Sequence, residues 1–395
     1  MKFKIHIILL LLCIVGIPAN TQASDTDLEV SGWIPYWRDS EGIKDAKKHI
    51  KSIDIVYPFA FTVTTKGELR DQTGLDKKDW KSFVKTAQRK DVKIIPTVMW
   101  SDGVSTLSVL SNPTTRASHV EGIVDMVEDG NYDGVDIDYE GKVQGTKESF
   151  SAFLTELREA LGDEKILSCT IEPRTPPSSL YKDVPETMKY INDYAVIGDV
   201  CDRIVIMAYD QQRADIKLND ERSGKPYIPL ADKNWVEKVI KETLKELPKE
   251  KVVLGIASYG HHYAVSVAPN WYRDYWKLGA MNVPDILDVA KREKVTPTRN
   301  DAGEMSFTYL PKGSSHVNFK GITIPKNTPK GMKVGAQALA YANKTGKEVI
   351  FNIGWYSDAE AMNDKIKLAK KYKLLGVSLF KIDGEEDQKV WKYLP

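Results

Sequence analysis

Short, nearly continuous apolar runs alternate along the chain with longer amphipathic segments. The runs are rich in β-branched residues, as is typical of strands buried on both faces of a parallel sheet. We expect eight such strands, at residues 30–36, 53–61, 92–98, 134–140, 166–171, 203–209, 252–257 and 376–382.

The segments between these runs have the spacing of amphipathic helices. From Lys147 to Leu161 the apolar side chains recur on one stripe, which predicts a helix with Thr146 as its N-cap and Gly162 just past its end. Similar spacing predicts helices over 234–247 and from about 357 to the last strand.

Eight strands joined by helical crossovers indicate an α/β protein built as a (β/α)8 TIM barrel. A doubly wound open sheet would give the same alternation. The number of strands and the length of 395 residues favour the barrel. In addition, no glycine-rich phosphate-binding motif follows the first strand, which argues against a dinucleotide-binding sheet.

One interval between expected strands is much longer than a single helix requires. Between strands 7 and 8 we expect a small α+β insertion over 263–347, and the barrel then comprises 24–262 and 348–395. Because loops at the carboxyl ends of barrel strands border the active site, this insertion should form one wall of a cleft. Its expected apolar runs lie at 305–310 and 317–324, and its expected helices at 282–293 and 333–343.

The N-terminus has the layout of a secretory signal peptide. Lys2 and Lys4 precede an apolar run over 5–17, and Pro18 and small residues follow it. We expect residues 1–23 to be removed, which predicts a secreted, extracellular or cell-envelope protein with no membrane span after removal. The alternative of an uncleaved anchor stays open, although the run is short for a membrane span.

Composition excludes some classes of partner. The chain has 56 Lys and Arg against 55 Asp and Glu, a net charge of +1, so no basic excess indicates nucleic acid. Beyond the signal segment, Cys169 and Cys201 fall on neighbouring expected strands. A disulfide is possible there, but we favour buried free thiols, and the spacing predicts no metal site.

The most informative segment spans residues 133–140 and reads Asp-Gly-Val-Asp-Ile-Asp-Tyr-Glu. Side chains two apart on a strand share a face, so Asp136, Asp138 and Glu140 should line up inside the barrel. Crowded carboxyl groups raise the pKa of at least one member, as a general acid requires. A half-exposed strand or a calcium loop would be the ordinary alternatives, but the strand is central and the glycine and glutamate positions do not fit an EF-hand loop.

At these residues the sequence resembles the glycosyl hydrolases of family 18, the chitinase family. The family signature Asp-Gly-x-Asp-x-Asp-x-Glu, at the end of barrel strand four, is matched in full by residues 133–140. Residues 207–210 resemble the family's Met-x-Tyr-Asp at strand six, and 32–37 resemble its aromatic first strand. The resemblance covers nearly the whole chain after the signal segment.

The resemblance implies a mechanism in which the substrate supplies its own nucleophile. Glu140 would protonate the glycosidic oxygen while the substrate's 2-acetamido oxygen attacks the anomeric carbon, with retention of configuration. Asp138 would orient the acetamido group, Asp136 would share a proton with Asp138, and Tyr209 would hydrogen-bond the acetamido carbonyl. No metal or organic cofactor is implied.

The implied substrate is a polysaccharide that contains N-acetylglucosamine, of the chitin or the peptidoglycan type, and we expect a monomeric enzyme. A sugar-binding lectin on the same fold is the alternative function. Such lectins generally lose the glutamate that stands here as Glu140, so its presence favours an enzyme. The expected substrate-binding residues are Asp210, Tyr36, Phe61, Trp100, Met207 and Phe380.

Three features depart from the common family pattern. Residues 94–100 replace the usual Ser-x-Gly-Gly of the third strand and are closer to the bacterial branch that acts on cell-wall and spore glycans. Phe380 stands where a tryptophan is usual at the floor of the site. Arg174 offers a charge that a muramic acid carboxylate could pair with, although a simple Arg174–Glu172 pair is the more economical interpretation.

Further aromatic and histidine side chains are candidates for the outer cleft. Trp37, Trp271 and Trp276 could stack on sugar rings, although packing is the favoured interpretation of each of them. His261 and His262 follow strand seven without the spacing of metal ligands, and we expect them to have structural or polar-lining roles.

Overall fold

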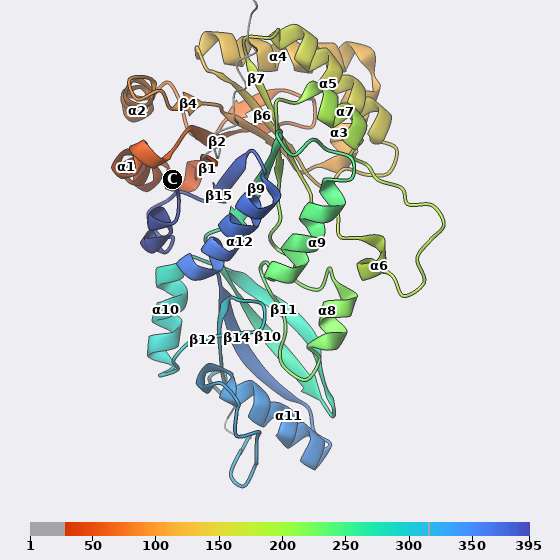
Figure 1. The fold of residues 1–395 in the computed structure, drawn as a ribbon, viewed down its shortest axis with the longest axis vertical. Helices are drawn as coiled ribbons and strands as arrows, with labels where there is room; N and C mark the ends of the chain where they lie inside the picture. Colours follow the sequence, from red (N-terminus) through yellow and green to blue (C-terminus); the bar gives the residue numbers. More distant parts are fainter. Residues whose placement is uncertain (1–27, 315–316) are drawn as a thin grey trace, which may run out of the picture.

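The computed structural model describes residues 28–314 and 317–395. Its barrel lies in the upper half of Figure 1, and a second sheet with its own helices extends below it. The expected signal peptide, residues 1–23, lies outside the described residues. Within the part of the chain that the structure describes, no helix combines the length and the apolar character that a membrane crossing requires.

The upper part is a closed barrel of parallel strands, as predicted. The strands follow one another in the order β1-β15-β9-β8-β7-β6-β5-β2, and β2 pairs back to β1 to close the ring. The eight strands are β1 Glu29–Pro35, β2 Ile55–Val63, β5 Thr97–Trp100, β6 Gly134–Tyr139, β7 Ile166–Ile171, β8 Arg203–Ile206, β9 Val252–Ala257 and β15 Gly376–Phe380.

Two strands differ most from their predicted extent, and the others agree with it to within two residues at each end. The third one is divided into β4 (Lys93–Ile94) and β5, because Pro96 lies between them and has no N–H to donate to a ladder. The sixth was expected to reach residue 209, but β8 ends at Ile206. The chain beyond it turns, and Asp210 adopts a left-handed conformation with φ of 53°.

Helices surround the barrel on its outer side (Figure 1). They are α1 Asp39–Lys48, α2 Lys78–Gln88, α3 Gly103–Ser111, α4 Pro113–Asp129, α5 Lys147–Leu161, α7 Tyr194–Val200, α9 Lys233–Thr243 and α12 Ala359–Tyr372. Helix α5 has its predicted bounds, and Gly162 follows it with φ of 67°. Thr146 stands at the N-cap position, as predicted, but its hydroxyl donates to the carbonyl of Val143 and accepts no N–H of the first helical turn.

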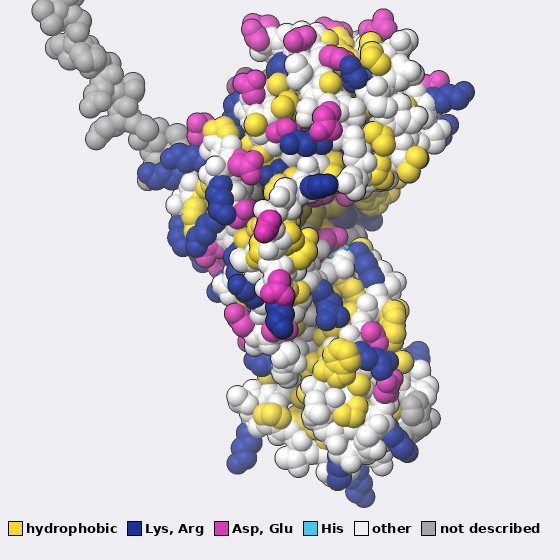
Figure 2. Space-filling view, turned by 90° about the vertical axis from the view of Figure 1, so that its right-hand side faces the viewer, with side chains coloured by type: hydrophobic (Ala, Val, Ile, Leu, Met, Phe, Trp, Pro, Cys, Tyr) yellow, Lys and Arg dark blue, Asp and Glu magenta, His cyan; other side chains and the backbone are white. Residues whose placement is uncertain are grey.

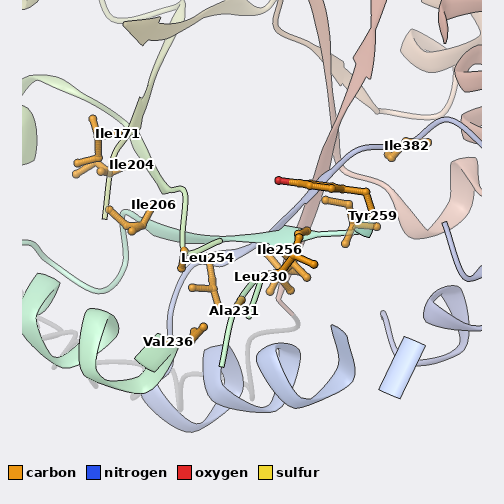
Figure 3. Packing of buried hydrophobic residues seen from close by; sticks show 14 of the residues in the cluster. Ile171, Ile204, Ile206, Leu230, Ala231, Val236, Leu254, Ile256, Tyr259 and Ile382 are labelled. Carbon is orange, nitrogen blue, oxygen red and sulfur yellow. The ribbon is translucent and has the colours of Figure 1, made fainter. Parts of the chain in front are cut away.

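Helix α9 is shorter than the predicted 234–247. The Asp232 side chain caps it by accepting the N–H of Asn234 at 2.8 Å. On its inner side, Val236 lies beneath Ile206 and Leu254 from the outer face of the barrel sheet (Figure 3). These three side chains are at most 2% exposed, so this interface belongs to the main hydrophobic core.

The lower part is built on a five-stranded antiparallel sheet in the order β11-β10-β14-β13-β12. Of the expected apolar runs, 305–310 forms β13, whereas 317–324 forms neither strand nor helix because the chain turns at Gly321. The elements are β10 Gly260–Ala268, β11 Trp271–Met281, α10 Val283–Arg292, β12 Thr298–Arg299, β13 Met305–Tyr309, α11 Lys333–Thr345 and β14 Val349–Tyr356.

The sheet extends beyond the segment expected to form the insertion. Strand β10 begins before residue 263 and β14 lies after residue 347, and these two strands pair directly with each other. The insertion therefore leaves the barrel through two adjacent strands rather than through flexible linkers. The division into a barrel and an insertion at 263–347 remains a proposal.

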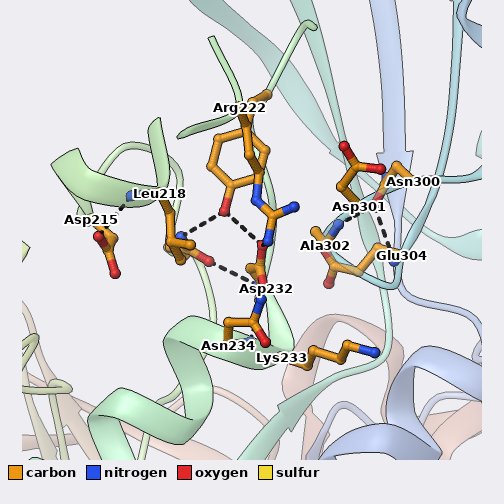
Figure 4. Close-up of polar contacts among 12 residues, drawn as sticks. Asp215, Leu218, Arg222, Asp232, Lys233, Asn234, Asn300, Asp301, Ala302 and Glu304 are labelled. Carbon is orange, nitrogen blue, oxygen red and sulfur yellow. Dashed lines mark hydrogen bonds and ion pairs between the residues drawn. The ribbon is translucent and has the colours of Figure 1, made fainter. Parts of the chain in front are cut away.

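A buried carboxylate joins the two parts of the molecule. Glu304, directly before β13, accepts the backbone N–H groups of Leu230 and Ala231 at 3.0 and 3.1 Å. It also accepts the indole N–H of Trp355 at 2.7 Å. Figure 4 shows Glu304 near a second polar pair, Arg222 and Asp232, on the barrel side. Because these groups are buried and paired, the insertion is held in one position against the barrel.

A disulfide corrects our preference for free thiols. Cys169 on β7 is bonded to Cys201, just before β8, with their Cα atoms 6.1 Å apart. The parallel pairing of Ser168 with Arg203 aligns the two strands so that these cysteines face each other on the outer side of the sheet. Spacing along the chain could not reveal this alignment, because it depends on strand register.

A buried carboxyl group near the C-terminus predicts a pH dependence of stability. Burial raises the pKa of Glu386 to about 7 from 4.5, and nearby Asp45 adds to the shift. The folded state therefore binds this proton more tightly than the unfolded chain, so the free energy of unfolding should fall as the pH rises from about 4.5 to about 7.

We expect Glu386→Gln to remove roughly 2 kcal/mol of this pH dependence, because a glutamine at position 386 does not titrate. Urea unfolding of both proteins near pH 5 and near pH 8 measures the difference. Equal changes with pH in the wild type and the variant would contradict the expectation.

Candidate active site

The predicted row of acids lies along β6 and just beyond its end. Asp136 and Asp138 are buried, at 0% and 4% exposure, and face the barrel interior. Val135 and Ile137 alternate with them and pack into the outer core. Glu140 follows the strand and is only partly buried. The pleat of one strand therefore separates chemistry on its inner face from packing on its outer face.

Asp136 is the deepest member of the row and is fully hydrogen-bonded. Its Oδ2 accepts the Thr97 hydroxyl at 2.8 Å and the Trp33 indole N–H at 3.3 Å. Its Oδ1 accepts the hydroxyls of Ser168 and Thr170 at 2.9 and 2.8 Å. Burial raises the pKa of Asp136, and these four donors oppose the shift. The carboxylate is thus held in one orientation beneath Asp138.

Asp138 and Glu140 both have raised pKa values, for related reasons. Burial raises the pKa of Asp138 well above its usual range, and the charges of Glu140 and Asp136 add to this. Burial also raises the pKa of Glu140, with a further contribution from Glu172, while Lys142 lowers both values. Asp138 Oδ1 is buried with no hydrogen-bond partner among the described residues. A raised pKa lets a carboxyl group keep a proton for transfer.

These acids open onto a cavity of about 280 Å³ at the carboxyl ends of the barrel strands. Phe380 forms an apolar surface in it, and the ring of Tyr209 stacks on Phe380 with a centroid distance of 5.9 Å. The edges of Trp33 and Phe59 complete this aromatic surface. The lining residues are Trp33, Phe59, Asp138, Glu140, Thr170, Glu172, Pro173, Met207, Tyr209, Asp210, Tyr259 and Phe380.

The segment after β8 contributes a donor and an acid. Burial raises the pKa of Tyr209 well above its usual range, so its hydroxyl stays protonated and can donate a hydrogen bond. Asp210 accepts the hydroxyl of Tyr259 at 2.7 Å and lies 3.4 Å from Nε2 of His261. Burial lowers the pKa of His261 to about 4, so this contact is made by a neutral imidazole near pH 7.

A second cavity, of about 380 Å³, adjoins the first and shares Asp210, Tyr259 and Phe380 with it. Its far side is formed by the insertion, through side chains of β10, β11 and α10 such as His261 and Lys277. The predicted wall is therefore present. In Figure 2 the surface is indented between the barrel, above, and the insertion, below.

The tryptophan and histidine side chains considered for the outer cleft lie in different environments. Trp37 is 49% exposed and lines the second cavity, whereas Trp271 and Trp276 are similarly exposed on β11 and line neither cavity. His262 Nε2 and the Tyr309 hydroxyl form a hydrogen bond of 2.7 Å within the insertion, which is a structural contact.

Six predicted site residues line the first cavity, namely Asp138, Glu140, Met207, Tyr209, Asp210 and Phe380, and Asp136 lies beneath it. Three others lie elsewhere. Trp100 is 2% exposed and packs against His119 and Tyr139 in the outer core, because it alternates with the inward-facing Thr97 and Met99. Its position does not support the predicted contact with substrate.

Phe61 and Tyr36 also line neither cavity. On β2, Tyr57 and Phe59 face the barrel interior, but a register shift between Phe59 and Phe61 breaks the alternation. Phe61 therefore packs against the outer core. Tyr36 packs beside the interior cluster, with its ring edge-on to Trp37 at 4.8 Å.

The sequence interpretation missed several lining residues, among them Trp33, Phe59, Glu172 and Tyr259. Trp33 and Phe59 stand at inward positions of their strands, so alternation counted from the strand ends could have identified them. Glu172 was noted only as a partner for Arg174. Tyr259 lies on the turn between β9 and β10, for which no sequence pattern indicated a direction.

Arg174 does not face the cavity, which corrects both earlier interpretations of it. Its guanidinium lies between the rings of Tyr190 and Tyr194, 3.9 and 3.4 Å from their centroids. It pairs with Glu246 at 2.8 Å rather than with Glu172. With its charge matched and its faces covered, Arg174 has no donor directed at a substrate carboxylate.

The described ranges contain no candidate metal site. Within 28–314 and 317–395, no group of three or more His, Cys, Asp or Glu side chains is arranged to hold a metal ion.

The comparison with known families decides the assignment. A family model described as glycosyl hydrolases family 18 matches residues 32–385. The chain belongs to this family. The glycoside hydrolase family that the signature at 133–140 indicated is thus confirmed, and the cavity above β6 is the candidate active site of a family 18 glycoside hydrolase.

Two relatives of this family 18 protein are glycosylases of Bacillus subtilis. The glycosylase YvbX of Bacillus subtilis is 23% identical over 292 residues, covering 74% of this chain and 69% of YvbX. YdhD of the same organism is 28% identical over 236 residues, covering 58% of this chain and about half, 51%, of YdhD.

A solved structure supports the fold. The spore cortex-lytic enzyme SleL of Bacillus cereus superposes with a TM-score of 0.65 and 16% identity, over 93% of this chain and 73% of SleL. At this level of identity the likeness concerns the barrel fold alone.

Proposed function

We propose that this family 18 hydrolase cleaves β-1,4 linkages next to N-acetylglucosamine, with retention of configuration and with the substrate's acetamido group as nucleophile. One observation carries the proposal. Asp138, Glu140 and Tyr209 open onto one cavity, and a buried oxygen of Asp138 has no partner among the described residues. An acetamido N–H is the donor that would satisfy this oxygen.

In the first step, the protonated carboxyl group of Glu140 gives its proton to the glycosidic oxygen. The bond from that oxygen to the anomeric carbon breaks, and the acetamido carbonyl oxygen forms a new bond to the same carbon, which gives an oxazolinium ion. Asp138 accepts the acetamido N–H and offsets the positive charge, while the Tyr209 hydroxyl donates to the acetamido oxygen and orients it.

In the second step, water attacks the anomeric carbon from the side that the leaving group vacated. The Glu140 carboxylate takes a proton from this water, and the bond from the acetamido oxygen breaks, which restores the acetamido group. Two displacements at one carbon leave its configuration unchanged. Glu140 ends the cycle protonated, as it began.

The aromatic surface beneath the site supports a sugar ring as the ligand. Phe380, with Tyr209 stacked on it, offers an apolar plane of the kind on which the face of a pyranose packs. Phenylalanine presents less area than tryptophan and has no N–H. Binding of the sugar ring should therefore rely more on Asp138 and Tyr209.

Among polymers of N-acetylglucosamine, we propose the peptidoglycan type first, with chitin as the alternative outcome. The support is the sequence likeness to YdhD, whose name refers to a sporulation-specific glycosylase, together with the departure of residues 94–100 from the common chitinase pattern. We also propose a monomeric enzyme that acts outside the cytoplasm or in the cell envelope.

Proton NMR of the first product tests the proposed mechanism. We expect the β-anomer of the new reducing sugar to appear first and the α-anomer to follow only by mutarotation, because the acetamido route retains configuration. Early accumulation of the α-anomer would contradict it. Mass profiling of products from defined chitin and peptidoglycan oligomers identifies the substrate class in the same experiment.

A further inference from the structure

Glu172 lies on the rim of the catalytic cavity, directly after β7. It is outside the family signature at 133–140, and no role was predicted for its carboxylate in catalysis. Its side chain is 38% exposed, so one side faces the cavity while the other side is in contact with protein.

The contacts of Glu172 converge on the segment that follows Glu140. Oε1 accepts the backbone N–H of Gly141 at 3.3 Å, and Oε2 lies 3.4 Å from Nζ of Lys142. Gly141 has φ of 61°, so the chain turns sharply just after Glu140. Glu172 thus holds both residues that come next after the candidate acid.

Lys142 connects this contact back to β6. Its Nζ is also hydrogen-bonded to the carbonyl of Tyr139 and lies 4.8 Å from the centroid of Phe150. The ammonium group of Lys142 is buried and therefore links the turn after Glu140 to Tyr139, the residue before it. Glu172 is the carboxylate that pairs with this ammonium group.

Glu172 is itself anchored from behind. Oε2 accepts the side-chain N–H of Asn192 at 2.8 Å. The carbonyl of Asn192 accepts a hydrogen bond from Arg174, which is held between two tyrosine rings and by Glu246. Arg174, which cannot reach substrate, thus has a supporting role at the end of this chain of contacts.

We propose that Glu172 is a positioning residue for the proton transfer, which fixes the turn that carries Glu140 and places a negative charge beside its carboxyl group. This role rests on the proposed function of Glu140. Four charged groups act on that carboxyl group, namely Asp138 on β6, Lys142 in the turn, Glu172 after β7 and Asp210 after β8.

The charge of Glu172 should be measurable in the pH profile. Of the charged groups that raise the pKa of Glu140, Glu172 has the largest effect after burial, whereas Lys142 acts in the opposite direction. Removing the negative charge while keeping the shape of the side chain should lower the pH at which Glu140 loses its proton.

The test compares Glu172→Gln and Glu172→Ala in the full-length protein with a fluorogenic N-acetylglucosamine oligomer. Glutamine keeps an oxygen for Gly141, so we expect the alkaline limb of kcat/KM to move down by at least about half a pH unit with moderate loss of rate. Alanine also removes the contacts, so we expect kcat to fall about tenfold or more with little change in KM. Glu186→Gln, an exposed change of equal charge, is the control and should leave the profile unchanged.

Suppose that the wild type is active. An unshifted alkaline limb in Glu172→Gln, or full kcat in Glu172→Ala, would then overturn the role of Glu172 alone. A wild type inactive on chitin and peptidoglycan oligomers would instead overturn the proposed function, and this role with it. If the alanine variant does not fold, the pH profile of the glutamine variant decides.

Discussion

Glu140→Gln is expected to lower kcat by at least about 10²–10⁴-fold, the range that proton transfer by a positioned side chain contributes. Glutamine has nearly the same size and can still hydrogen-bond, but it has no acidic proton for the glycosidic oxygen. Because Glu140 lies at the cavity rim and beyond the end of β6, the substitution should leave the fold and sugar binding intact.

The measurement is steady-state hydrolysis of a fluorogenic N-acetylglucosamine oligomer, with thermal unfolding as a check on folding. Glu159→Gln, on the exposed outer face of α5, changes the same groups far from the cavity and serves as the control. Near-normal turnover in Glu140→Gln would exclude this residue as the acid. A large loss in both variants would indicate a general effect of the substitution instead.

Loss of the Cys169–Cys201 disulfide is expected to cost about 3–4 kcal/mol in the free energy of unfolding. The bond closes a loop with a sequence separation of 32 residues, and it restricts the unfolded chain more than the folded one. It also joins β7 to the entry of β8, the strands that precede Glu172 and Tyr209. The double variant Cys169→Ala, Cys201→Ala should fold but unfold at lower urea concentration.

Urea unfolding of the wild type, in the presence and absence of reductant, provides the matched comparison. We expect the reduced wild type and the double variant to have similar midpoints, both below that of the oxidised wild type. Equal midpoints for all three would contradict a stabilising disulfide. Activity per folded molecule should change little, since neither cysteine lines the cavity.

The period of the hydrophobic pattern was sufficient to predict the barrel. All eight strands lie close to their expected positions because each is buried on both faces, which requires an apolar run that is easy to recognise. Helix α5 has its predicted bounds for a similar reason, since its apolar stripe is continuous from Phe150 to Leu161. Prediction was weaker where a local feature overrode the pattern, as at Pro96 in the third strand.

The site residues that lie on one strand were predicted correctly. Those contributed by several elements were predicted less well. Asp136, Asp138 and Glu140 share a face by strand geometry alone. Phe61 was expected on the inner face, but a bulge in β2 reverses its direction, and a bulge leaves no reliable mark in the sequence. Trp100 could have been excluded by counting alternation from Thr97.

The sequence by itself determined the fold class, the inward row of acids and the family, because these depend on residue type and on periods of two and 3.6 residues along one chain. Only the tertiary structure decided that Cys169 meets Cys201, that Arg174 supports Asn192 and that Glu172 holds the turn after Glu140. Each of these contacts joins residues at least 18 positions apart along the chain. Their proximity depends on strand register and loop path, which local pattern does not encode.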